Sequence, residues 1–122
     1  RAYHGRVTRT LSLWLPVLAW AGLIFGLSAI PSLSTGLGTW DLVLRKCAHA
    51  TEYAILAVLL WRALRRELAA LALAVAYAAT DEWHQTFVHG RHGSPVDVAI
   101  DAAGATLGLV LLLHVARPRL AR

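Results

Sequence analysis

Long apolar stretches separated by short polar segments dominate the pattern of this chain. The first stretch covers residues 11–30 and carries no charged side chain. Three further stretches cover residues 43–63, 67–87 and 95–115. Each has about 20 residues, which is the length an α-helix needs to cross the ~30 Å hydrocarbon core of a bilayer. The pattern therefore predicts an all-α protein, an integral membrane four-helix bundle that forms a single domain over residues 1–122.

Turn-forming residues mark the connections between these stretches. Pro31 and the serines and glycines after it indicate a loop, and Gly90–Pro95 indicates another. Between them, Asp41–Leu44 is predicted to form a short interfacial turn. The segment 1–30 has the basic start of a secretory signal, but its apolar run is longer than a signal peptide usually has. We therefore expect a retained first helix, with neighbouring helices antiparallel because the loops are short.

Composition and charge agree with a lipid environment. The chain is 57% hydrophobic and 16% charged, and its net charge is +5. Nine of the twelve Lys and Arg residues lie in the N-terminal segment, the second connection and the C-terminal tail. An even number of spans places these regions on one side, and the positive-inside rule makes that side the cytoplasm. The positive charge is thus a topology signal and a contact for anionic lipid, not a nucleic-acid surface. Cys47 is the only cysteine, so no intrachain disulfide can form.

The acidic residues follow the opposite distribution. Six of the seven lie in the outer half of the predicted bundle: Asp41, Glu52, Asp81, Glu82, Asp97 and Asp101. A charged group near hydrocarbon is costly, so it tends to be paired, to face the bundle interior and to be functional. The sequence therefore predicts one polar site that faces the outside of the membrane.

The second predicted helix carries Lys46, His49 and Tyr53 on one face, with Glu52 close to that face. Lys and Tyr also anchor helix ends at the membrane interface, so Lys46 and Tyr53 remain open between an anchor and a site residue. Glu52 lies two turns inside the helix, where an anchor role is less suitable. We expect His49 and Glu52 to be functional or internally paired.

The third predicted helix ends in a cluster of polar side chains. Asp81 and Gln85 share one face, and Glu82 is rotated from them by about 100°. Two neighbouring carboxyl groups can divide into a base and an acid when burial separates them. Glu82 or Asp81 is therefore the candidate general base, and His49 is its proton partner. The same carboxylates could instead only neutralise nearby basic residues.

The fourth predicted helix has a stripe that is polar at its start and small below. Asp97 and Asp101 are followed at helical spacing by Gly104 and Gly108, a pair that allows close helix contact. Asp97 also suits charge compensation at a helix N-terminus, and Asp101, a turn deeper, suits it less. Both aspartates are candidate binding residues.

The loop before this helix adds Arg91 and Ser94 to the candidate binding residues. Arg91 could hold a phosphate or carboxylate in a fork, or it could close the loop by pairing with Asp97. No Gly-x-Ser-x-Gly elbow supports Ser94 as a nucleophile. The ligand-capable side chains match no metal motif such as His-Glu-x-x-His, so we expect neither a metal nor another cofactor.

Taken together, four motifs resemble the VanZ-like family of small bacterial membrane proteins. They are Lys46-x-x-His49-x-x-x-Tyr53, Asp81-Glu82-x-x-Gln85, Arg91-x-Gly93-Ser94-x-x-Asp97 and Gly104-x-x-x-Gly108. The resemblance covers about residues 45–108. It implies a bacterial cytoplasmic membrane protein and a link to low-level resistance to teicoplanin, a lipid-tailed glycopeptide that binds peptidoglycan precursors. The family pattern is expected to have Asn where this chain has Asp101, so this chain carries an additional carboxylate.

These observations lead to two functional hypotheses. In the first, the outward-facing pocket recognises or processes an amphipathic envelope molecule, such as a lipid-linked precursor, a phospholipid headgroup or a lipoglycopeptide, with Lys46 and Arg91 holding an anionic group. In the second, the protein is a non-catalytic module that shields an envelope component or assists a partner protein. A proton-coupled transporter is weaker, because the polar residues cluster at one end and not at the midplane. The expected partner is a membrane lipid or lipid-linked molecule and not nucleic acid, and the sequence leaves oligomerisation open.

Overall fold

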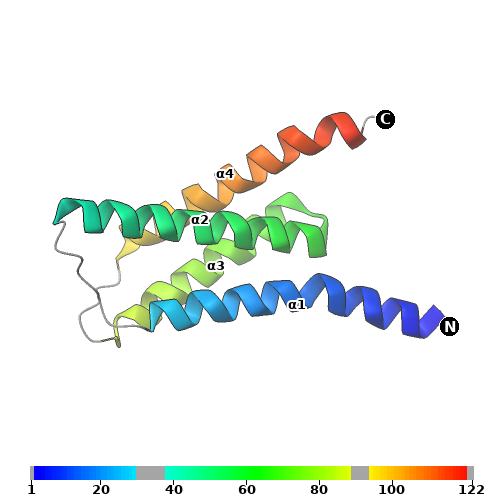
Figure 1. Ribbon diagram of the computed structural model, residues 1–122, viewed down its shortest axis with the longest axis horizontal. Helices are drawn as coiled ribbons and strands as arrows, with labels where there is room; N and C mark the ends of the chain where they lie inside the picture. The colour runs from blue at the N-terminus through cyan, green and yellow to red at the C-terminus, as the bar shows by residue number, and fades with distance from the viewer. Residues whose placement is uncertain (1, 30–37, 89–93, 121–122) are drawn as a thin grey trace.

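A computed structural model shows the chain as four long helices connected in sequence (Figure 1). The structure describes residues 2–29, 38–88 and 94–120. The helices are α1 (Ala2–Ser28), α2 (Thr39–Leu64), α3 (Glu67–Gln85) and α4 (Pro95–Leu120). No strand occurs in these three ranges. The predicted all-α, four-helix architecture is confirmed.

The start of α2 corrects one expectation from the sequence. Asp41–Leu44 does not form a separate interfacial turn, because α2 already begins at Thr39. The backbone N–H of Asp41 donates to the carbonyl of Gly38 at 3.0 Å, which closes the first turn. The Asp41 carboxylate also lies in that turn, where an acidic group interacts favourably with the helix dipole. The helix therefore continues to the loop without an intervening turn.

The first helix also begins earlier than the apolar run alone indicates. α1 starts at Ala2, whereas the uncharged run starts at Leu11. Polar residues in the added turns bond within the helix: the hydroxyls of Thr8 and Thr10 donate to the carbonyls of His4 and Arg6 at 2.8 and 3.0 Å. Hydrophobicity defines the part of a helix suited to lipid, and the hydrogen-bonded helix extends beyond it.

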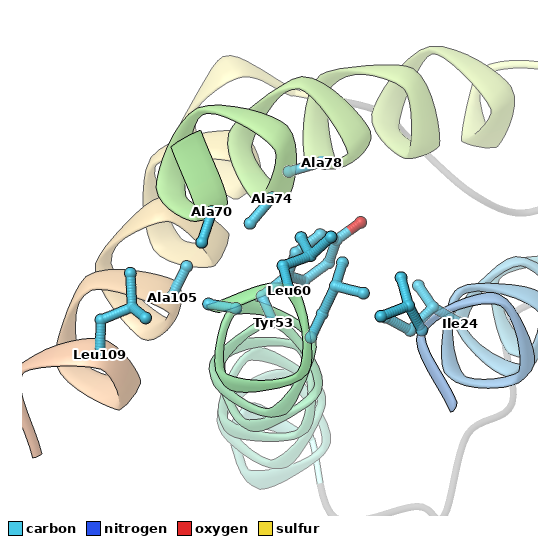
Figure 2. Packing of buried hydrophobic residues seen from close by; sticks show 11 residues of the cluster. Ile24, Tyr53, Leu60, Ala70, Ala74, Ala78, Ala105 and Leu109 are labelled. Carbon is cyan, nitrogen blue, oxygen red and sulfur yellow. The ribbon is translucent and has the colours of Figure 1, made fainter. Parts of the chain in front are cut away.

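α2 is the central helix of the bundle. It packs against each of the other three helices, whereas α1 packs against α2 and α3 and, within the described residues, not against α4. Figure 2 looks along α2 and shows Ile24 of α1 on one side and Ala105 and Leu109 of α4 on the other. The face that α3 turns to the core consists of alanines at every fourth position, Ala70, Ala74 and Ala78, all fully buried. Small side chains on one face let helices approach closely.

The contact between α2 and α4 is closer still, because glycines provide it. A Cβ atom added to Gly104 would lie 2.7 Å from the Ala50 Cα, and one added to Gly108 would lie 2.8 Å from the Ala54 carbonyl oxygen. At Gly104 the nearest atoms of α2 are backbone atoms of Ala50, and at Gly108 they are backbone atoms and the Cβ of Ala54. The predicted role of the glycine pair in close helix contact is confirmed.

The outer surface of the bundle is strongly apolar. α1 and α4 contain stretches long and apolar enough to cross a membrane, Tyr3–Ser28 and Pro95–Ala116. Large side chains on them point away from the other helices, among them Leu15, Leu18, Leu107 and Leu111. Exposed apolar surface on this scale is unusual in a soluble monomer and suits contact with lipid.

The ends of the helices fall into two groups (Figure 1). The beginning of α1, the end of α4 and the turn between α2 and α3 lie at one end of the bundle. The end of α1, the beginning of α2, the end of α3 and the beginning of α4 lie at the opposite end. The tight turn is made by Arg65, whose φ of 58° is left-handed and whose N–H donates to the Trp61 carbonyl at 2.7 Å. This arrangement gives the predicted antiparallel neighbours and makes α2 and α4 parallel to each other.

The glycine contact predicts a large effect of a single methyl group. Replacing Gly104 with alanine should destabilise the bundle by about 1–3 kcal/mol, because the backbones of α2 and α4 must separate to admit the new Cβ. Gly26→Ala is the matched control, since a Cβ at Gly26 would meet no atom within 4 Å. The measurement is unfolding in detergent micelles on titration with dodecyl sulfate, followed by circular dichroism. Equal midpoints for the two variants would contradict the close contact.

Candidate functional site

A cavity of about 330 Å³ lies between the beginnings of α2 and α4 and the end of α3. Eight of its ten lining residues are polar or charged, and two are aliphatic. The lining residues are Leu42, Arg45, Lys46, His49, Glu82, Gln85, Ser94, Asp97, Ile100 and Asp101. Polar residues of α2, α3 and α4 thus meet at one end of the bundle, as the sequence predicts.

Two pairs of charged groups connect α2 to α4 along one wall. The Lys46 ammonium forms an ion pair with the Asp97 carboxylate. One turn further along both helices, His49 Nδ1 lies 3.3 Å from an oxygen of Asp101. Lys46 and His49 share a face of α2, and Asp97 and Asp101 share a face of α4, because residues three and four apart are neighbours on a helix. The two pairs are therefore stacked, with the deeper one completely shielded at Asp101, which is 0% exposed.

Glu82 connects α3 to the beginning of α4. Its Oε2 accepts the backbone N–H of Ser94 at 3.0 Å. The hydroxyl oxygen of Ser94 in turn accepts the backbone N–H of Asp97 at 3.3 Å, which is the arrangement of a helix N-cap. The other carboxylate oxygen of Glu82 is buried and has no hydrogen-bond partner among the described residues. Glu82 thus binds the start of α4 through one oxygen, and its other oxygen can accept a proton or bind a ligand.

Asp81 belongs to a different cluster, on the side of α3 that faces α1. Its Oδ2 accepts the hydroxyl of Ser28 at 2.9 Å and that of Tyr53 at 3.3 Å. Close to it, the Tyr77 hydroxyl donates to the Ala21 carbonyl. Asp81 does not line the cavity. As adjacent residues of one helix, Asp81 and Glu82 point about 100° apart, and only Glu82 is placed for chemistry in the cavity.

The other candidate residues divide between the cavity and its surroundings. Tyr53 is fully buried in the α1-facing cluster, and Glu52 lies outside the cavity walls, with its backbone carbonyl accepting the Trp20 indole N–H at 2.9 Å. Gln85 reaches both regions, since it lines the cavity and its amide lies 3.5 Å from the Ser28 hydroxyl. Arg91 lies outside the described residues.

The sequence interpretation missed three residues of the cavity wall and one of the neighbouring cluster. Leu42 and Arg45 belong to the same face of α2 as His49, at seven and four residues before it, so helical spacing could have identified them. Ile100 is adjacent to Asp101 and gave no separate signal. Ser28 was not a candidate because it lies in the uncharged first helix, far from the polar motifs in sequence.

A helical bundle with an apolar outer surface and a cavity lined by charged residues at one end is the class of a small helical membrane protein. A family model described as VanZ/LLP1 matches residues 4–117, nearly the whole chain. The chain belongs to this family, and the resemblance stated from its motifs is confirmed. No curated protein and no solved structure matched the chain significantly.

The α1-facing cluster predicts that Ser28 stabilises the bundle. Ser28→Ala should cost about 1–3 kcal/mol, because it removes a hydroxyl donor from the buried Asp81 carboxylate. Ser12→Ala is the control on the same helix: Ser12 is exposed and bonds only the Arg9 carbonyl, so its loss should change stability by less than about 0.5 kcal/mol. Unfolding midpoints in the same micelles measure both, and a Ser28 variant as stable as the control would show that Asp81 does not need this donor.

Proposed function

We propose that this protein binds the polar headgroup of an amphipathic cell-envelope molecule in the cavity between α2, α3 and α4. The molecule is a lipid-linked precursor, a phospholipid or a lipoglycopeptide such as teicoplanin, with its headgroup in the cavity and its apolar part along the outer faces of the helices. The observation that carries the proposal is the polar cavity at one end of a bundle whose outer surface is apolar. A ligand with one polar and one apolar part matches both surfaces.

The size and lining of the cavity fit a headgroup. About 330 Å³ is at the small end of the range for ligand sites, which are usually concave with a few well-placed polar groups. Arg45 and Lys46 supply positive charge for a phosphate or carboxylate, and Leu42 and Ile100 supply apolar contact. Glu82 has a buried oxygen available to take a proton, and His49 lies in the same cavity as its partner. This set supports processing of the headgroup as well as recognition.

The distribution of basic residues supports an orientation for the site. Seven of the nine Lys and Arg residues in the described ranges belong to segments at the end of the bundle opposite the cavity. By the positive-inside rule that end is cytoplasmic, so all four helices span the bacterial cytoplasmic membrane and the cavity opens outward. Arg45, Lys46, His49 and Glu82, which line the cavity, are among the polar residues that lower the hydropathy of α2 and α3.

A static role is the second candidate, and the ion pairs favour it. Lys46 with Asp97 and Glu82 with the Ser94 N–H connect three helices and satisfy charges that would otherwise be unpaired. A protein that only shields an envelope component, or assists a partner protein, needs no more than such a network. The difference between the two candidates is turnover.

The orientation predicts which end of α3 is accessible from outside. In a Cys47→Ser background, a single Thr86→Cys should react with a membrane-impermeant maleimide on intact bacterial cells, and a single Arg66→Cys should react only after permeabilisation. Both positions are exposed and lie at opposite ends of α3, so they form a matched pair. The reverse labelling pattern would place the cavity in the cytoplasm and rule out an outward-facing site.

The ligand and the chemistry are tested together by mass spectrometry. The purified protein should retain an envelope lipid with an anionic headgroup and, on incubation with extracted bacterial envelope lipids, convert it to a product. Glu82→Gln should lower turnover at least 100-fold while keeping the fold, because the amide oxygen can still accept the Ser94 N–H. Glu67→Gln, at the other exposed end of α3, is the control and should retain full turnover. A retained lipid without any product would favour the shielding module, and no retained lipid would refute headgroup binding.

A further inference from the structure

Three side chains from three helices meet at the inner part of the cavity. They are His49 of α2, Glu82 of α3 and Asp101 of α4, and one ligand atom of each lies within 4.8 Å of the others. All three line the cavity, so their ligand atoms face the same space. Imidazole nitrogen and carboxylate oxygen are common ligands of divalent transition-metal ions.

The carboxylates of this group are buried with incomplete compensation. Asp101 is 0% exposed and Glu82 is 5% exposed. Among the described residues, one oxygen of Glu82 and both oxygens of Asp101 have no hydrogen-bond partner, and one of the Asp101 oxygens forms the ion pair with His49. A buried charge without compensation is strongly unfavourable. His49, even when protonated, supplies one positive charge for these two carboxylates, and Lys46 is already paired with Asp97. Arg45 also lines the cavity, so its wall as a whole is close to neutral when His49 is protonated. The buried group of His49, Glu82 and Asp101 by itself still carries one net negative charge, which a cation bound among them would neutralise.

We infer that His49, Glu82 and Asp101 form a binding site for a divalent transition-metal ion such as Zn²⁺ or Mn²⁺. Zinc–ligand bonds of about 2.0–2.2 Å place ligand atoms roughly 3.3–3.5 Å apart, and the His49 Nδ1 to Asp101 oxygen distance is 3.3 Å. A ligand atom of Glu82 lies within 4.8 Å of those of His49 and Asp101, so the Glu82 side chain has to move only a short way to complete the site. Three protein ligands facing an open cavity leave a coordination position for water or a ligand group, as in sites that act on a substrate.

The metal follows from the donor set. Calcium prefers six to eight oxygen ligands, and magnesium keeps several waters and is seldom held by imidazole. A site with one nitrogen and two carboxylate oxygens instead suits zinc, manganese or iron. The sequence gave no motif for it, because the three ligands come from three separate helices and only the fold brings them together.

A bound ion would restrict the ligands of the cavity to headgroups that carry an anionic group. This inference about the ligand rests on the proposed function. With the ion bound, the inner cavity changes from negative to near neutral or positive. An anionic group of the headgroup, a phosphate or carboxylate, then binds the open coordination position while Arg45 and Lys46 contact it from the cavity wall. With the ion bound, Glu82 and His49 are its ligands, and this role replaces the base and proton-partner roles given to them above for the cavity without an ion.

The first experiment measures ion binding directly, without lipid. Full-length protein in detergent, carrying no His tag, is stripped with EDTA and dialysed against Zn²⁺ or Mn²⁺, and bound metal is quantified by plasma mass spectrometry. Wild type should hold about one ion per chain. His49→Gln, Glu82→Gln and Asp101→Asn should each weaken binding at least 100-fold. The controls His114→Gln and Glu67→Gln, both exposed and at the far ends of α4 and α3, should bind as wild type does.

A second measurement needs no variant. X-ray absorption at the zinc edge of the wild-type protein should show one imidazole nitrogen among oxygen ligands. No stoichiometric ion, a shell without imidazole, or binding that survives all three ligand substitutions would each overturn the site. Lipid retention measured in EDTA and in Zn²⁺ then tests whether the ion holds the anionic headgroup. Equal retention in both would overturn the contact between ion and headgroup and leave the ion site itself unaffected. A wild-type protein that retains lipid but holds no stoichiometric ion overturns the ion site and leaves the proposed function intact.

Discussion

The close contact between α2 and α4 is the constraint on which the rest of the structure depends. Gly104 and Gly108 bring the two backbones together at Ala50 and Ala54. Because these helices run parallel, the same stripe of α4 continues from the glycines to Asp101 and Asp97 and meets His49 and Lys46 of α2 in order. One helix seam therefore positions both the small residues that hold the bundle together and the charged residues that line the cavity.

Much of this arrangement could be predicted from the sequence. The apolar runs identified four helices, and the spacing of Asp97, Asp101, Gly104 and Gly108 identified a single stripe with close contact. That stripe is reliable because its members lie on one helix, where the period of 3.6 residues fixes their relative directions. The family motifs combined the same positions, and the VanZ/LLP1 match extends over nearly the whole chain.

The division of α3 into two polar faces could not be predicted. Asp81 and Glu82 are adjacent and chemically alike, and the sequence gave no rotation of α3 about its axis that would decide which one faces the cavity. The structure turns Glu82 toward α2 and α4 and Asp81 toward Ser28 of α1. Tyr53 stacks beside His49 on α2, as the spacing predicts, with 6.5 Å between the ring centroids, but its hydroxyl donates to Asp81. Relations between helices, such as the meeting of Ser28 with Asp81, depend on packing that no local pattern specifies.

The glycine seam also limits how this protein can change over evolutionary time. His49 directly precedes Ala50, and Asp101 is one turn from Gly104, at a backbone contact that admits no extra methyl group. Substitutions that shift either helix therefore disturb folding and site together. Leu42 and Ile100 contribute apolar surface to the cavity but take no part in the ion pairs or the glycine contact. Substitution of these two side chains can therefore change which ligand binds, while the ion pairs between α2 and α4 stay the same.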